Sequence, residues 1–133
     1  MITPDLGFTP KGIYIGGEWQ ESTSGKTFET INPSNRERLG EVPEATEKDV
    51  DRAVAAAKAA FEEWSRVPIT ERARCMEELA KRIDEHADEL ALMDAVDAGN
   101  AVTGMRGDMD WTAQTFRYFA GLTVPQAAEA LGV

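Results

Sequence analysis

The sequence has little of what catalytic and metal-binding sites commonly use. Its 133 residues include one cysteine, Cys75, and one histidine, His86. A single cysteine excludes an internal disulfide, in agreement with a reducing compartment. A lone histidine cannot supply the several nitrogen or sulfur ligands of a zinc site. No Gly-x-Gly-x-x-Gly occurs either, so the sequence offers no dinucleotide fingerprint.

Basic residues and long apolar runs are also scarce. Lys and Arg number 14 against 24 Asp and Glu, a net charge of -10, whereas nucleic-acid binding needs clustered positive charge. No stretch approaches the roughly 20 apolar residues of a membrane span, and the first five residues contain no basic segment typical of a secretory signal. We therefore expect a soluble cytoplasmic protein with no nucleic-acid or membrane partner, folded as a single domain over 1–133.

Strand patterns fill the N-terminal part, residues 12–42. Two short apolar segments, Ile13–Ile15 and Glu18–Gln20, flank Gly16-Gly17, and two glycines supply the positive φ angles of a type I′ hairpin turn. Alternating apolar and polar side chains predict a further strand at Thr27–Ile31. A short strand at Leu39–Val42 is expected after the turn that begins at Asn32-Pro33.

Helical periodicity replaces the strand pattern from Thr46 onward, and a helical layer is expected over 46–121. Thr46 and Asp49 resemble a capping box, which predicts a helix at 47–64. A second long helical region begins at Pro68 or Thr70 and ends at Gly99, and a third helix runs from Val102 or Thr103 to Phe119. The predicted fold class is mainly α, with three long helices and a small N-terminal antiparallel β-hairpin or sheet.

The helical spacing also predicts which side chains are buried. In the third helix these are Met105, Met109, Trp111, Thr112, Phe116 and Phe119. Cys75 falls at the edge of an apolar arc, so a core or boundary thiol is favoured over a reactive one, although Arg72 and Arg74 are near it in the sequence. His86 is interpreted as a solvated surface residue because acidic residues surround it.

Six segments in order resemble the opening part of aldehyde dehydrogenases. They are Tyr14-Ile15-Gly16-Gly17-Glu18-Trp19, Ser24-Gly25-Lys26-Thr27-Phe28-Glu29-Thr30-Ile31-Asn32-Pro33, Glu41-Val42-Pro43-Glu44-Ala45, Ala59-Ala60-Phe61-Glu62-Glu63-Trp64, Glu71-Arg72-Ala73-Arg74 and Arg117-Tyr118-Phe119-Ala120-Gly121. The resemblance extends from about Gly12 to Gly121. The tail at 122–133 does not read like the family's link to its next strand.

The resemblance implies that this chain has the fold of the N-terminal part of the α/β aldehyde dehydrogenases. It also implies that the residues that carry out the reaction lie outside the matched segment. Members oxidise an aldehyde to a carboxylic acid through a thiohemiacetal on a cysteine, and the hydride passes to NAD or NADP. Their catalytic cysteine, glutamate and cofactor-binding strands all come after the segment matched here. The implied site therefore has no catalytic and no cofactor-binding residue within this chain.

Two lesser features are implied by the resemblance. Relatives hold a structural monovalent cation at positions corresponding to Thr30, Ile31 and Asp97; alternatively, Thr30 is an ordinary strand residue and Asp97 a helix-end acceptor. The last helix lines the aldehyde entrance in relatives, which would put Trp111 near a substrate tunnel, but core packing of Trp111 is favoured because large aromatics dominate buried area.

Two classes of function remain open. The first is the N-terminal segment of an NAD(P)-dependent aldehyde dehydrogenase, catalytically incomplete on its own, or of a complex completed by a missing catalytic chain. The second is a noncatalytic helical interaction module or truncated remnant that self-associates. Either class predicts apolar helix faces that need a partner, so a homo-oligomer or a tight complex is expected.

Overall fold

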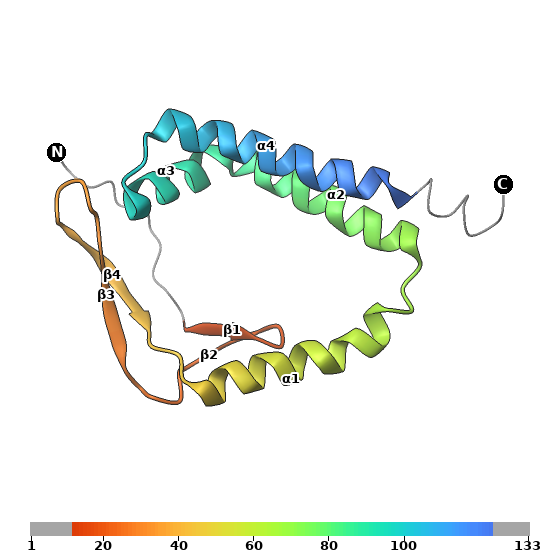
Figure 1. The fold of residues 1–133 in the computed structure, drawn as a ribbon, viewed down its shortest axis with the longest axis horizontal. Helices are drawn as coiled ribbons and strands as arrows, with labels where there is room; N and C mark the ends of the chain where they lie inside the picture. Colours follow the sequence, from red (N-terminus) through yellow and green to blue (C-terminus); the bar gives the residue numbers. More distant parts are fainter. Residues whose placement is uncertain (1–11, 124–133) are drawn as a thin grey trace. The chain divides into compact units, whose positions relative to one another are not determined.

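The computed structural model describes residues 12–123, drawn in colour in Figure 1. The chain divides into two compact units, Met1–Arg66 and Val67–Val133. The division falls between the first and second helices, so the first helix belongs with the strands. Of the tail expected at 122–133, the residues from Val124 onward lie outside the described part.

The first unit contains two antiparallel hairpins. Strands β1 (Ile13–Ile15) and β2 (Glu18–Gln20) pair across Gly16 and Gly17, whose φ angles of 63° and 88° confirm the predicted turn. Strands β3 (Thr27–Ile31) and β4 (Arg38–Pro43) confirm the two further strands predicted, the second one residue longer at each end. They pair as a second hairpin, with a register irregularity between Thr30 and Ile31.

Helix α1 (Glu47–Trp64) follows the second hairpin and confirms the predicted bounds. Thr46 is its N-cap, and both reciprocal hydrogen bonds of the capping box with Asp49 are present. The β1–β2 hairpin lies alongside α1 (Figure 1), and Ile15 of β1 is buried. The apolar stripe of α1 is not covered: Phe61 is 65% exposed.

The second unit is a bundle of three helices, α2 (Ile69–Glu85), α3 (Ala87–Ala98) and α4 (Val102–Gly121). Helix α4 packs along both α2 and α3 (Figure 1). Residues 12–123 thus contain four helices where three were expected, because the second helical region is interrupted at His86. The backbone there has φ -112° and ψ 14°, outside the helical range, and α3 starts a new helix with Asp88 and Glu89 in its first turn.

Small side chains form the centre of this bundle. Between residues 67 and 123, the buried apolar residues are Ala80, Ala87, Ala91, Val96, Ala113 and Ala120. Alanines at the contact let helix axes approach to about 8 Å, the short end of the usual range. The larger apolar side chains Met76, Ile83, Met109 and Phe116 are half-buried around this centre.

Three side chains lie differently from the prediction. Trp111 and Phe119 were expected to be buried, but they are 72% and 52% exposed. The α4 face that packs on α2 and α3 carries Ala113 and Phe116, and Trp111 falls outside that face. Cys75, expected at the edge of the core, is exposed on α2. Helical spacing identified the apolar residues correctly but not the neighbours available to cover them.

Candidate functional site

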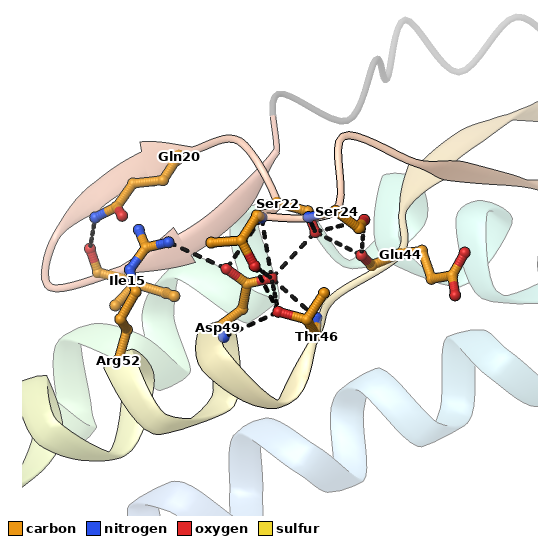
Figure 2. Close-up of polar contacts among 9 residues, drawn as sticks. Ile15, Gln20, Ser22, Ser24, Glu44, Thr46, Asp49 and Arg52 are labelled. Carbon is orange, nitrogen blue, oxygen red and sulfur yellow. Dashed lines mark hydrogen bonds and ion pairs between the residues drawn. The ribbon is translucent and has the colours of Figure 1, made fainter.

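The most densely hydrogen-bonded polar group of the first unit is the carboxylate of Asp49, in the first turn of α1 (Figure 2). Asp49 is 2% exposed. Its Oδ2 accepts the backbone N–H of Thr46 at 2.9 Å and lies 2.9 Å from the Thr46 hydroxyl. The backbone N–H of Thr23 donates to the same carboxylate at 3.1 Å. A buried charge is thus surrounded by donors from two segments of the chain.

These donors lower the pKa of Asp49 well below its ordinary value. The largest cause is the backbone hydrogen bond from Thr46, which favours the charged form. Burial acts in the opposite direction, and the hydroxyl of Thr46, the backbone of Thr23 and the hydroxyl of Ser22 lower the pKa further. The position at a helix N-terminus also favours a negative charge. Asp49 is therefore a fully ionised anchor and a poor general base.

The same cluster fixes the loop between the two hairpins. The hydroxyl of Ser22 lies 3.1 Å from Asp49 Oδ2 and 2.5 Å from the carbonyl oxygen of Glu44, and Ser24 Oγ donates to that carbonyl at 2.7 Å. Arg52 closes the cluster from the next helical turn, with Nη1 3.0 Å from Asp49 Oδ1. The loop, the strand end and the start of α1 are thereby joined into one polar cluster.

In the second unit, two arginines of α4 form ion pairs with aspartates. Arg106 Nε lies 2.6 Å from Asp88 of α3, and the guanidinium also pairs with Asp110 one turn along α4. Arg117, in the Arg117-Tyr118-Phe119-Ala120-Gly121 segment, pairs with Asp84 near the end of α2. The pKa of Arg106 is raised chiefly by its hydrogen bond to Asp110, and that of Arg117 by its hydrogen bond to Asp84. These pairs orient α4 on its neighbours.

The residues implied for a cation site are divided between the units. Thr30 pairs with Gly40 across the β3–β4 hairpin, and Ile31 follows it at the register irregularity. Asp97 is an exposed residue in the last turn of α3, ahead of Gly99, whose φ of 77° ends that helix as predicted. Among residues 12–123, no three His, Cys, Asp or Glu side chains gather closely enough to hold a metal ion.

The remaining candidates lie on the surface of the second unit. His86 is exposed, as predicted, and its Nδ1 is 3.1 Å from Glu89 Oε2. Cys75 and Trp111 are exposed on α2 and α4. Within the described range no helix is both long and apolar enough to cross a membrane.

Sequence reasoning found one part of the Asp49 cluster and missed the rest. The spacing of Thr46 and Asp49 indicated the capping box, but Ser22 and Thr23 were not identified as partners. They precede Asp49 by more than twenty residues, and no local periodicity indicates such a contact. A run of small hydroxyl residues at Ser22-Thr23-Ser24 was the available signal.

The chain belongs to the aldehyde dehydrogenase family, whose model matches residues 19–131. That match runs beyond Gly121, where the recognisable segments end, and into the tail that was expected to diverge. The four helices and two small sheets correspond to the N-terminal part of the aldehyde dehydrogenase fold.

Individual relatives agree with this assignment. An aldehyde dehydrogenase from Aspergillus niger is 46% identical over 113 residues, 84% of this chain and 23% of the relative. Aminoaldehyde dehydrogenase 2 from Zea mays is 38% identical over 135 residues, covering 98% of this chain and 26% of the relative. The chain therefore spans about a quarter of the length of each of these two relatives.

Solved structures show the same relationship in three dimensions. Betaine aldehyde dehydrogenase from Staphylococcus aureus, in complex with NAD+, superimposes with a TM-score of 0.84 at 38% identity over 88% of this chain and 24% of its own. HpcC from Thermus thermophilus gives a TM-score of 0.82 at 39% identity over 85% of this chain and 22% of its own.

Proposed function

We propose that this chain forms the N-terminal segment of an NAD(P)-dependent aldehyde dehydrogenase that oxidises an aldehyde to a carboxylic acid. The observation that carries the proposal is the family match over residues 19–131, together with 46% identity to the Aspergillus niger aldehyde dehydrogenase. The NAD+ complex of the Staphylococcus aureus relative supports a nicotinamide cofactor for the complete enzyme.

The contribution of residues 1–133 is structural in this proposal. Asp49, the carboxylate with the most strongly lowered pKa, is occupied by hydrogen bonds that hold a loop to α1. A nucleophile needs an adjacent base to activate it, and Cys75 lies exposed on α2, in the unit that does not contain Asp49. The catalytic cysteine, the base and the cofactor site belong to sequence outside these 133 residues.

The proposal has two further parts. The first is a monovalent cation bound at Thr30, Ile31 and Asp97. The second is a place for Trp111 beside the aldehyde entrance. The register irregularity between Thr30 and Ile31 supports the first, since a bulge re-aims successive backbone groups. The high exposure of Trp111 supports the second, because it leaves the indole free to line a surface built by other parts of the enzyme. In the complete enzyme, K⁺ should raise the unfolding temperature, and Asp97→Ala should remove that effect while Asp94→Ala retains it.

The alternative is a noncatalytic interaction module. Exposed apolar side chains on α1 and α4 favour it, because contiguous apolar patches commonly mark contact surfaces. A homo-oligomeric, cytoplasmic aldehyde dehydrogenase would use the same surfaces of α1 and α4 as contact surfaces. The two functions differ in whether the chain restores activity to a dehydrogenase that lacks its own N-terminal quarter.

Two measurements test the proposal. The purified chain should produce no NADH or NADPH from any aldehyde, and Cys75→Ser should change nothing. A chimera in which this chain replaces the matched 113 residues of the Aspergillus niger relative should oxidise aldehydes with NAD or NADP. A folded chimera without activity would contradict the proposed function, and aldehyde oxidation by the isolated chain that disappears in Cys75→Ser would contradict the assignment of catalysis to other sequence.

A further inference from the structure

The outer face of α4 carries an aromatic ring and a carboxylate close together. At about 100° per residue, Trp111 lies about 160° around the helix from Ala113, the buried residue of the packing face. Asp108 and Tyr118 each lie within about 60° of Trp111, one and two turns away along α4. All three are exposed, Trp111 by 72% and Tyr118 by 63%. Side chains one turn apart have Cβ atoms about 5–6 Å from each other, so one small group can contact the indole and the Asp108 carboxylate together.

The turn before the indole leaves room for a ligand. Side chains of a helix lean toward its N-terminus, so the indole of Trp111 leans over the turns that contain Gly104 and Gly107. A Cβ added to either glycine would meet nothing within 4 Å. Neither glycine has a side chain that could cover the ring, and the indole therefore keeps an open face.

The charge beside this ring is negative and has no counterion. Both basic residues of α4, Arg106 and Arg117, are ion-paired with aspartates and lie more than about 100° around the helix from Trp111. Within residues 12–123, the Asp108 carboxylate forms no ion pair. The outer face of α4 thus combines an open indole with a negative charge that a ligand can neutralise.

A cationic group suits this combination better than a neutral or an anionic one. A cation is attracted to the face of an aromatic ring, most strongly to that of Trp, and quaternary ammonium groups are common ligands of such faces. An apolar group at the same place would desolvate the Asp108 carboxylate without giving it a partner. An anion would be repelled by that carboxylate.

We infer that Trp111, Asp108 and Tyr118 form a specificity surface for aldehydes that carry a cationic group. The inference rests on the proposed function, which puts Trp111 beside the aldehyde entrance. Trp111 contributes the ring that the cation contacts, Asp108 contributes the opposite charge, and Tyr118 extends the aromatic surface along α4. The cationic end of the substrate is held at this surface, and the aldehyde carbon reaches catalytic residues supplied by the rest of the enzyme.

A matched pair of aldehydes tests the inference in the Aspergillus niger chimera. One is butanal with a terminal trimethylammonium group, and the other has a tert-butyl group in its place, so the two share a shape and differ by one charge. The ratio of their kcat/KM values isolates the contribution of that charge. Trp111→Leu should lower the ratio about tenfold, whereas Trp111→Phe should retain most of it because Phe keeps a ring face. Asp108→Asn should lower the ratio several-fold, and the control Asp51→Asn on α1 should leave it unchanged.

Two results in an active chimera would overturn the inference. An equal loss of kcat/KM for both aldehydes in Trp111→Leu would mean that the indole shapes the entrance or packs against the rest of the enzyme. A ratio that neither Trp111→Leu nor Asp108→Asn changes would mean that this face does not recognise the charge.

Failure of the proposed function gives a different result, a folded chimera that is inactive toward both aldehydes. Calorimetric binding of the two corresponding carboxylic acids to that chimera then decides the inference. Tighter binding of the trimethylammonium acid, lost in Trp111→Leu, would support the cation surface. Equal affinity for the two acids would overturn it.

Discussion

Thr46 and Asp49 hydrogen-bond each other reciprocally at the start of α1. The Thr46 backbone N–H donates to Asp49 Oδ2 at 2.9 Å, and the Asp49 backbone N–H reaches Thr46 Oγ1 at 3.4 Å. The pair serves two purposes at once, since the carboxylate that caps the helix also receives Thr23 from the preceding loop. Helix formation and loop placement are therefore coupled through one side chain.

Removal of the cap should destabilise the first unit. Thr46→Ala loses the side-chain acceptor of the N-cap, which typically costs about 1 kcal/mol. Asp49→Ala should cost more, because it leaves the backbone N–H groups of Thr23 and Thr46 without their acceptor. Urea unfolding followed by circular dichroism measures both. Equal stability of Asp49→Ala and the Glu47→Ala control would show that the cluster contributes nothing.

Acid should weaken the same unit through Asp49. The pKa of Asp49 is lowered in the folded chain, whereas the pKa of an Asp in an unfolded chain is about 3.9. The unfolded state therefore binds more protons in this range, so the stabilisation is complete above about pH 5 and is lost progressively as the pH falls below about 4. The difference in unfolding free energy between the wild type and Asp49→Asn should shrink from pH 6 to pH 3. A constant difference would contradict the lowered pKa.

The centre of the helical bundle should not tolerate larger side chains. Ala113 of α4 is fully buried where α4 meets its neighbours. Ala113→Leu should destabilise the second unit by about 1–3 kcal/mol, the usual cost of overpacking. The neighbouring exposed position serves as the control, since Gln114→Leu should change the stability by less than about 0.5 kcal/mol. Thermal unfolding measures the stability of both variants. An Ala113→Leu variant as stable as the wild type would mean that the helices are not closely packed.

Two glycines should respond oppositely to the same substitution. Gly99 ends α3 with φ 77°, so Gly99→Ala should destabilise by about 1–2 kcal/mol, the cost of a left-handed backbone at a residue with a Cβ. Gly107 lies inside α4, and a Cβ added there meets nothing within 4 Å. Gly107→Ala should stabilise by up to about 1 kcal/mol. Calorimetry measures the stability of both variants. Stability changes of the same sign for Gly99→Ala and Gly107→Ala would refute the difference in backbone conformation.

Local sequence was enough to predict the elements whose signals are local. Gly16 and Gly17 specify a turn that few other residues adopt, and Thr46 with Asp49 marks the start of α1 to the residue. The break at His86 was not predicted, because the apolar spacing of α2 continues into α3 without a proline or glycine between them. Helix α4 packs against both α2 and α3, and no short window of sequence contains those contacts.

The sequence by itself determined the family, the first hairpin, the two further strands, the helical regions and the helix stop at Gly99. Only the tertiary structure decided that Trp111 lies outside the α4 packing face, that Cys75 is exposed, and that Ser22 and Thr23 complete the hydrogen bonds of Asp49. The physical reason is the range of the interactions. Backbone preferences and caps act within one turn of chain, whereas burial depends on which distant segment supplies the covering surface, and periodicity reveals an apolar face without naming its partner.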